Sequence, residues 1–303
     1  MIKRDGKKIL AGQRIGILGK GGSGKSTVTV LMARAFQHLG YQVNILDADS
    51  TNIGLFRALG FDSQPMSLLD YFGGTEFSGG LVSCPVDNPA VLPKSTISLK
   101  SLPKRYYRQM PGLNFLVAGK IGDRGPGAGC DGPISKITRD LKIVDSGKFP
   151  VTLIDLKAGL EDFARGVVTS LDWIITVVDP NIAAIQVAVD IKNLVLDIKA
   201  GKQPATKHLK SKILIRAANR IYRQAKIKNS FALLNKIDNS RIERSLIKSL
   251  ESQGVRVIGT LKQASSLSSS WLRGKALANS EAEGVLEKAI NNLQKETLNE
   301  KNV

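Results

Sequence analysis

The segment that most constrains the fold is the glycine-rich stretch from Gly19 to Thr27, which reads G-K-G-G-S-G-K-S-T. It follows an apolar run, Ile15 to Leu18, that predicts a short buried strand. It precedes Val28 to Leu39, where apolar residues recur at helical spacing. In this strand–loop–helix context, the pattern G-x-x-x-x-G-K-[ST] predicts a phosphate-binding loop rather than a chance glycine-rich turn.

The residue types in this loop suit the binding of a nucleotide. Its glycines allow backbone N–H groups to turn toward phosphate oxygens, and the following helix N-terminus adds unpaired amides. Lys25 supplies a cation for the β- and γ-phosphates, and the hydroxyl of Ser26 can ligate Mg²⁺. The predicted nucleotide contacts in this loop are Gly19, Lys20, Gly21, Gly22, Ser23, Gly24, Lys25, Ser26 and Thr27.

A second lysine, Lys20, directly follows the first glycine of the loop. The form K-G-G-x-G-K-[ST] resembles the deviant Walker A motif of the MinD/ParA ATPases. That group includes the nitrogenase iron protein and the nickel-insertion ATPases (CooC) of carbon monoxide dehydrogenase. The resemblance implies that Lys20 reaches across a nucleotide-sandwich homodimer to the phosphates of the partner subunit. The alternative is a solvated loop lysine.

Composition sets outer limits on the class of protein. The chain has 303 residues, which fits one large α/β domain better than two, and no apolar run approaches the roughly 20 residues of a membrane span. The N-terminal residues 1–8 lack the apolar core of a signal peptide. Two cysteines make no disulfide scaffold, so a cytoplasmic location is expected. The formal charge of +18 predicts attraction to polyanions or to an acidic partner.

Acidic residues follow a second predicted strand, Tyr41 to Leu46. Because ligands of open parallel sheets bind beyond the carboxyl ends of the strands, Asp47 and Asp49 are expected beside the glycine loop. Asp49 resembles the switch I aspartate of the family, which implies that it orients the attacking water and helps to hold Mg²⁺ through its hydration shell. Asp47 is either part of this site or a structural acid. Ile53 replaces an aspartate that many ParA-type and iron-protein sequences carry, so the hydrolysis geometry departs from theirs.

Another strand is predicted from Pro150 to Leu156, and Asp155 near its end resembles the Walker B carboxylate that anchors the water shell of magnesium. The continuation to Glu161 matches the family's switch II pattern D-x-x-A-G-x-E. The resemblance implies that the amide of Gly159 approaches the γ-phosphate. Lys157 replaces an acidic residue that is common at its position.

A later predicted strand, Phe231 to Leu234, is followed by Asn235, Lys236, Ile237 and Asp238. Read alone, N-K-x-D is the pattern that recognises guanine. In MinD-like ATPases the same strand end carries an asparagine, which bonds adenine, and a basic residue. The resemblance therefore favours ATP, with Asn235 and Lys236 at the nucleotide, while Asp238 leaves GTP open.

A glycine-rich loop with Cys130 follows the predicted strand Leu113 to Ala118 and precedes a helix expected from Ile134 to about Ile143. In the iron protein and the nickel ATPases, the corresponding loop carries a metal-binding cysteine. Cys130 would then bind a transition metal or an iron–sulfur cluster at the dimer interface, with Cys84 as a further ligand; alternatively it is a small loop residue. Gly132 stands where nickel ATPases have a second cysteine.

Two basic, loop-rich insertions, at about 76–112 and 199–230, lie outside the resemblance. The first follows a short helix expected from Met66 to Phe72, and in it Tyr106 and Tyr107 lie among lysines and arginines, which is compatible with base stacking. The second contains a helix expected from Ile213 to Tyr222 and has no acid. Each insertion is either a solvated surface or a docking surface for an acidic partner, nucleic acid or an anionic membrane.

The sequence thus predicts one domain over residues 1–303, with a three-layer α/β fold whose mostly parallel sheet has helices on both faces. The resemblance implies a P-loop ATPase that binds Mg-ATP, dimerises and hydrolyses slowly. Catalysis would use Asp49, Lys25 and the partner subunit's Lys20, with Mg²⁺ held by Ser26, Asp49 and Asp155. The role expected first is a maturation factor or metallochaperone for a client metalloenzyme. The alternatives are an iron–sulfur ATP-dependent reductase and a positioning ATPase that binds DNA or membrane.

Overall fold

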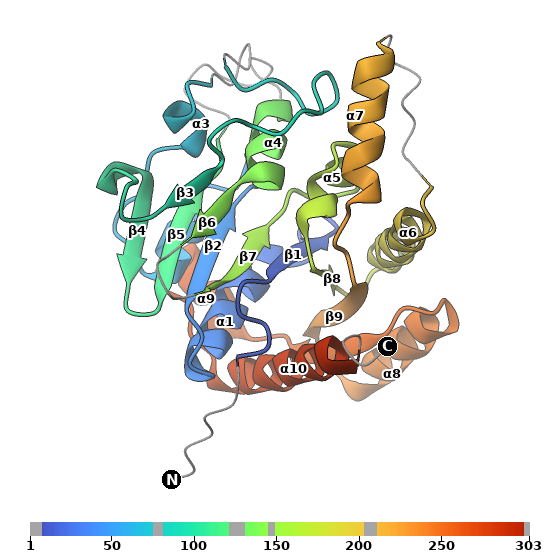
Figure 1. Cartoon of the computed structure of the whole chain (residues 1–303). Coiled ribbons are helices and arrows are strands. Elements are labelled where there is room, and N and C mark those ends of the chain that lie inside the picture. The colour runs from blue at the N-terminus through green and yellow to red at the C-terminus, as the bar shows by residue number, and fades with distance from the viewer. Residues whose placement is uncertain (1–7, 75–80, 121–130, 145–148, 203–210, 300–303) are drawn as a thin grey trace.

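The computed structural model describes residues 8–74, 81–120, 131–144, 149–202 and 211–299 (Figure 1). Its centre is an eight-stranded sheet in the order β10-β9-β8-β1-β7-β2-β5-β4. All neighbouring strands are parallel except β4, which is antiparallel to β5. The strands are β1 (Arg14–Gly19), β2 (Val43–Asp47), β4 (Tyr107–Met110), β5 (Leu113–Val117), β7 (Val151–Asp155), β8 (Trp173–Val178), β9 (Asn229–Ile237) and β10 (Val257–Lys262).

Helices cover both faces of this sheet, which confirms the predicted fold class. Consecutive strand residues turn to opposite faces, so Ile17 packs in one core cluster and Leu18 in the other. Because both faces are buried, the central strands are continuous apolar runs rather than alternating ones. The longer helices are α1 (Lys25–His38), α4 (Gly132–Asp140), α6 (Ile182–Lys199), α7 (Lys212–Arg223), α8 (Ser240–Ser252), α9 (Ser265–Leu272) and α10 (Ser280–Asn299).

The parallel register gathers the carboxyl ends of the central strands at one edge. Asp47 at the end of β2 is level with Asp155 at the end of β7 and with Val117 on β5. The end of β1 lies next to β7, with Ile17 opposite Asp155. The loops that follow β1, β2, β5 and β7 therefore share this edge, as the strand order requires.

The segment from residue 81 to 110, in the first basic insertion, is more ordered than a loop. It includes β3 (Thr96–Ser98), which pairs with β6 (Lys142–Val144), and β4, which makes a hairpin with β5. The helix predicted to reach Ile143 ends at Asp140, because residues 142–144 pair with β3 instead. The short helices are α2 (Leu55–Leu59), α3 (Leu68–Tyr71), α5 (Glu161–Ala164), η1 (Lys104–Tyr106) and η2 (Val167–Ser170).

Buried cations of α4 hold this insertion in place. The Nζ of Lys136 donates to the carbonyl of Asn88 at 2.8 Å, and the guanidinium of Arg139 donates to the carbonyl of Ala90 at 3.2 Å. Both side chains are buried, since the insertion lies over the helix. These bonds satisfy charges that would otherwise be costly to bury.

The tyrosines of this insertion are part of the core. Tyr106 and Tyr107 are each less than 10% exposed and pack in the cluster that includes Leu116. The Nζ of Lys104 lies 5.5 Å from the ring centroid of Tyr107, and the guanidinium of Arg105 lies 5.1 Å from that of Tyr106. The suggestion that these tyrosines stack on nucleic-acid bases is therefore wrong.

In the second basic insertion, α7 stands at the edge of the molecule beside α5 (Figure 1). Tyr222 is the only buried residue of this helix, all of which the structure describes. None of the described helices has the length and apolar character required to cross a membrane.

Gly16 in the middle of β1 is a sensitive point of the core. A Cβ added there would lie 2.5 Å from Cδ1 of Leu171 and 3.2 Å from Cδ1 of Leu156. We expect Gly16→Ala to destabilise the protein by about 1–3 kcal/mol, because these leucines must leave their packed positions. Urea unfolding followed by circular dichroism measures this change.

Gly284 in α10 provides the matched control, because a Cβ added there meets nothing within 4 Å. We expect Gly284→Ala to leave stability unchanged or to raise it by up to about 1 kcal/mol, as the helix propensity of alanine dictates. Equal stability changes in the two variants would contradict the packing assigned to β1.

Candidate nucleotide-binding site

The loop between β1 and α1 has the backbone shape that the glycine pattern predicts. Gly19 and Gly24 have φ of 143° and 98°, and an added Cβ would lie 2.5 Å from the carbonyl oxygen of Val177 at Gly19 and 2.2 Å from Nδ2 of Asn235 at Gly24. Neither position accommodates a side chain. The loop therefore closes tightly over the ends of two strands, with Lys25 as the first residue of α1.

The two lysines of the loop lie over its own carbonyl groups. The Nζ of Lys25 is 3.5 Å from the carbonyl oxygen of Lys20, and Lys25 is 7% exposed. The Nζ of Lys20 is 3.4 Å from the carbonyl oxygen of Gly21, and its side chain is half-buried. A phosphate bound in the loop offers both cations a negatively charged partner in place of these carbonyls.

Ser26 and Asp155 are brought together at the start of α1. The hydroxyl of Ser26 donates to Oδ2 of Asp155 at 2.6 Å, and the hydroxyl of Thr29 donates to Oδ1 at 3.4 Å. Complete burial raises the pKa of Asp155 to about 6, although the hydrogen bond from Ser26 and the charge of Lys25 act in the opposite direction. Hydroxyl and carboxylate oxygens are the donors that Mg²⁺ prefers, so these residues fit that ion.

Asn52 lies in this site, and the sequence did not single it out. Its Nδ2 donates to Oγ of Ser26 at 2.8 Å and to Oδ2 of Asp155 at 3.3 Å. The amide thus contacts the two oxygens that would ligate Mg²⁺. A magnesium ion held by these oxygens would take the place of the amide.

Asp49 is in the segment between β2 and Asn52. Its Oδ1 accepts hydrogen bonds from the amide of Thr51 at 3.0 Å and from the hydroxyl of Thr51 at 2.7 Å. The carboxylate therefore closes a local turn through Oδ1, and Oδ2 can still accept a hydrogen bond from a water molecule.

Lys120, which lies shortly after β5, holds Asp47 in place. Its Nζ donates to Oδ2 of Asp47 and to the carbonyl oxygen of Asp49, both at 2.6 Å. Burial raises the pKa of Asp47 to about 7, and the charge of Lys120 opposes that shift. Asp47 thus supports the turn that carries Asp49, a role that the sequence left undecided.

Lys157 and Ser50 meet at a common acid, Asp131, just before α4. The Nζ of Lys157 donates to Oδ2 of Asp131, and the hydroxyl of Ser50 donates to Oδ1 at 2.7 Å. Burial alone would raise the pKa of Asp131, but these two hydrogen bonds and the charges of Lys157 and Arg165 together more than offset it and leave the pKa below its usual value. The lysine that departs from the family pattern therefore connects the segments after β2 and β7.

Gly159 lies beside the glycine loop. Its φ is 95°, and its amide is 3.4 Å from the carbonyl oxygen of Gly19. No described atom would meet a Cβ there within 4 Å. The N–H group is positioned at the loop that is predicted to hold the phosphates.

A cavity of about 330 Å³ adjoins the loop at the ends of β9 and β10. Nδ2 of Asn235 donates to the carbonyl of Ser23 at 2.8 Å, and Nζ of Lys236 donates to the carbonyl of Gly22 at 2.7 Å. Asp238 is exposed and does not line this cavity. Its described walls include Gly24, Thr27, Asn235, Lys236, Leu267 and Trp271.

Trp271 closes one side of this cavity from α9, a helix that the sequence did not predict. Its Nε1 donates to Oγ1 of Thr27 at 2.8 Å, directly after the glycine loop. No motif marks the tryptophan, and only the packing of α9 against α1 brings it to the site.

Cys130 lies outside the described residues. Cys84 is half-buried, and its Sγ would be 2.4 Å from a Cβ added to Gly132. Among the described residues, no group of three or more His, Cys, Asp or Glu side chains is arranged to hold a metal ion.

Comparisons with known proteins place these features in a family. A family model described as the CobQ/CobB/MinD/ParA nucleotide binding domain matches residues 17–277. An uncharacterised ATP-binding protein of Methanocaldococcus jannaschii is 36% identical over 183 residues, which are 60% of this chain and 72% of that protein. The carbon monoxide dehydrogenase accessory protein CooC of Rhodospirillum rubrum is 28% identical over 197 residues, covering 61% and 70%.

Among solved structures, MinD in the MinC:MinD cell division complex of Aquifex aeolicus superposes with a TM-score of 0.57. The identity is 20%, and the match covers 93% of this chain and 95% of that one. At this identity the likeness concerns the fold.

The buried carboxylate of Asp162, in the first turn of α5, predicts a pH dependence of stability. Burial raises its pKa to about 7, although Arg165 opposes the shift. The folded state therefore keeps this proton at pH values where the unfolded chain, with a pKa of about 4, has lost it. Stability from this residue is present at low pH and is lost as the pH rises toward 7.

We expect Asp162→Asn to flatten this decline, so that the variant gains stability over the parent by up to about 1.4 kcal/mol per pH unit between pH 5 and 7. Urea unfolding of the nucleotide-free protein at several pH values measures it. Glu251→Gln, which alters an exposed carboxylate on α8, is the control. Parallel stability curves for parent and Asp162→Asn would contradict the assignment.

Proposed function

The chain belongs to the CobQ/CobB/MinD/ParA nucleotide-binding domain family, and we propose that it is a switch that binds Mg-ATP, closes into a homodimer and hydrolyses the β–γ bond slowly. The observation that carries this proposal is the pairing of Ser26 with the buried carboxylate of Asp155 at the first turn of α1. That pair, next to Lys25, supplies the ligands and the cation that a nucleoside triphosphate with magnesium requires.

ATP is favoured over GTP by the cavity beside the loop. Guanine recognition by N-K-x-D needs a carboxylate at the base, and Asp238 does not line the cavity, whereas Asn235 does. The relative from Methanocaldococcus jannaschii is described as an ATP-binding protein. An adenine ring beside Trp271 and Leu267 would have apolar surface on one side and the amide of Asn235 on another.

The proposed cycle assigns a task to each segment around the loop. Ser26 and Asp155 would hold Mg²⁺, with Asp49 acting through its water shell, and the bound ion would neutralise phosphate charge. Lys25, the partner subunit's Lys20 and the amide of Gly159 would stabilise the charge on the transferred phosphoryl group. Asp49 would orient the attacking water through Oδ2, because Thr51 bonds only to Oδ1.

The role that we favour for this switch is maturation of a client metalloenzyme, with the metal as cargo. It is supported by the similarity to the carbon monoxide dehydrogenase accessory protein CooC. Cys84, whose Sγ lies close to Gly132, would be a candidate thiolate ligand for this cargo. The same position keeps an iron–sulfur reductase as an alternative.

Variants of the two loop lysines test nucleotide binding and dimerisation separately. We expect Lys25→Ala to weaken Mg-ATP binding at least about tenfold, because it removes the phosphate cation within one subunit. We expect Lys20→Ala to keep most of this affinity but to lose ATP-dependent dimerisation and hydrolysis. Isothermal titration calorimetry, light scattering and phosphate release measure these effects.

The conservative variant Lys20→Arg keeps the positive charge and is the control for Lys20→Ala, which removes it. A Lys20→Ala protein that dimerises and hydrolyses like the parent would reduce the proposal to a monomeric switch. Absence of Mg-ATP binding by the parent would overturn it.

A second candidate function is attachment to a polyanionic surface, which α7 favours. Its basic residues lie four, four and three positions apart, which places them on one face of the helix, and α7 contains no acid. The hydroxyl of Tyr222 donates to the carbonyl of Phe163 in α5 at 2.6 Å, so the helix is joined to the segment that follows Gly159. The basic residues of this face are Lys212, Arg216, Arg220 and Arg223.

This candidate predicts salt-sensitive binding to nonspecific duplex DNA or to anionic lipid vesicles. On DNA, the double variant Arg216→Glu/Arg220→Glu is expected to lower the slope of log K against log salt by about two, since each lost phosphate contact contributes about 0.9. Lys288→Glu/Lys295→Glu, on the exposed side of α10, is the charge-matched control. If no probe is retained at low salt, this second candidate is ruled out.

A further inference from the structure

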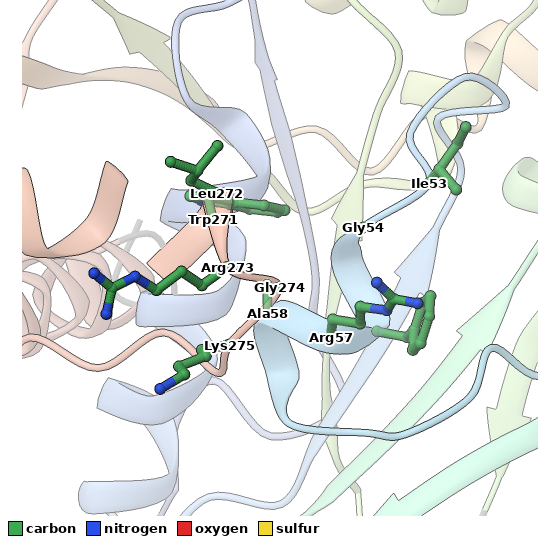
Figure 2. Close-up of a pocket in the computed structure, with 10 residues that line it drawn as sticks. Ile53, Gly54, Arg57, Ala58, Trp271, Leu272, Arg273, Gly274 and Lys275 are labelled. Atoms are coloured by element: carbon green, nitrogen blue, oxygen red, sulfur yellow. The ribbon is translucent and has the colours of Figure 1, made fainter. Parts of the chain in front are cut away.

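A second cavity, of about 430 Å³, lies between the start of α2 and the end of α9 (Figure 2). Figure 2 shows Ile53 and Trp271 approaching it from opposite sides. We call it the α2–α9 cavity. The two segments are joined below it, because the amide of Leu277 donates to the carbonyl of Ala58 at 2.8 Å. The cavity is therefore built on a backbone connection between elements far apart in the sequence.

The lining of the α2–α9 cavity combines positive charge with exposed apolar surface. Arg57, Arg273 and Lys275 contribute three cations, and the described residues that line it include no acid. At its mouth, Ile53 is 80% exposed and Leu272 is 89% exposed. Two large apolar side chains beside three cations form a surface that is complementary to an acidic segment with a bulky apolar residue.

The α2–α9 cavity shares a wall with the nucleotide site. Trp271 lines both cavities, and its Nε1 holds Thr27 at 2.8 Å. A Cβ added to Gly54 would lie 2.9 Å from Cζ3 of Trp271, so the backbone after Asn52 packs directly on the indole ring. Oδ1 of Asn52 accepts a hydrogen bond from the amide of Gly54 at 3.2 Å, so a movement of Asn52 away from Ser26 would also disturb Gly54, which lines the cavity.

From this geometry, we propose that the α2–α9 cavity docks an acidic, apolar segment of a partner protein, and that the nucleotide state of the glycine loop sets the affinity. Only the dependence on nucleotide rests on the proposed function. A second copy is a poor occupant, because a two-fold contact would place the same three cations against themselves. The cations set specificity and encounter rate, while Ile53, Trp271 and Leu272 provide apolar contact.

The test uses a fluorescein-labelled synthetic peptide of alternating glutamate and leucine, titrated with the full-length protein and followed by anisotropy. A peptide with lysine in place of glutamate is the ligand control. We expect saturable binding that weakens about tenfold or more in Leu272→Asp and in Arg273→Glu/Lys275→Glu, as expected for a lost apolar anchor or reversed charge. Ile213→Asp changes an equally apolar residue, 76% exposed on α7, and is expected to bind like the parent.

Tryptophan fluorescence with an unlabelled peptide gives a second measurement. Trp173 is fully buried in the core, so a change on adding peptide is assigned to Trp271 and is expected to vanish in Trp271→Phe. Adding Mg-ATP is expected to shift the peptide affinity at least about threefold, if Asn52 moves as inferred.

The outcomes separate this proposal from the proposed function. Three results would overturn the docking site alone. They are Mg-ATP binding without saturable peptide binding, binding of the lysine peptide as tight as that of the glutamate peptide, and equal peptide affinity of the cavity variants and Ile213→Asp. Peptide binding by a protein that takes up no Mg-ATP would support docking and reject the switch. If Leu272→Asp abolishes ATP-dependent dimerisation and no peptide binds, a second copy occupies the cavity and the proposal is overturned.

Discussion

The hydrogen bond between Ser26 and the buried carboxylate of Asp155 is the interaction on which the rest of the site depends. It joins the start of α1 to the end of β7. Asp155 is fully buried, which is unfavourable for its charge, and it lies where a magnesium ion would bind. Without a cation, burial raises the pKa of Asp155 to about 6, and the side-chain amide of Asn52 donates a hydrogen bond to its Oδ2. The nucleotide-free site is thus held by polar contacts that a magnesium ion would replace.

The segment after β2 is held at three points by residues from other parts of the chain. Lys120 holds the carbonyl of Asp49, Asp131 accepts from Ser50, and Asn52 donates to Ser26. Breaking the last contact alone leaves the first two in place. The movement on nucleotide binding is therefore expected to begin at Asn52 and to extend toward Ile53, with Ser50 as its fixed end. Lys157 strengthens that fixed end, since it shares Asp131 with Ser50.

The sequence predicts the central parallel strands, the glycine loop and the family, and the structure and the comparisons confirm them. These features depend on local patterns, such as an apolar run or a glycine at a strained turn. The pairing of β3 with β6 is not predicted, because each strand has three residues and forms only through contact with the other. Lys120 and Trp271 are missed for a related reason. Their partners, Asp47 and Thr27, are reached through the fold and not through spacing along the chain.

The positive charge of the chain divides into two populations with different consequences. Lys120, Lys136 and Arg139 point inward and donate to carboxylates or carbonyl groups, so they stabilise loops and contribute little to the field outside. The basic face of α7 and the rim of the α2–α9 cavity remain open to partners. Each of these surfaces contacts a segment near the glycine loop through a side-chain hydrogen bond. Tyr222 donates to the carbonyl of Phe163, and Trp271 donates to Oγ1 of Thr27. Because the two bonds reach different segments, a movement of the segment that contains Phe163 would affect α7, and a movement at Thr27 would affect the α2–α9 cavity.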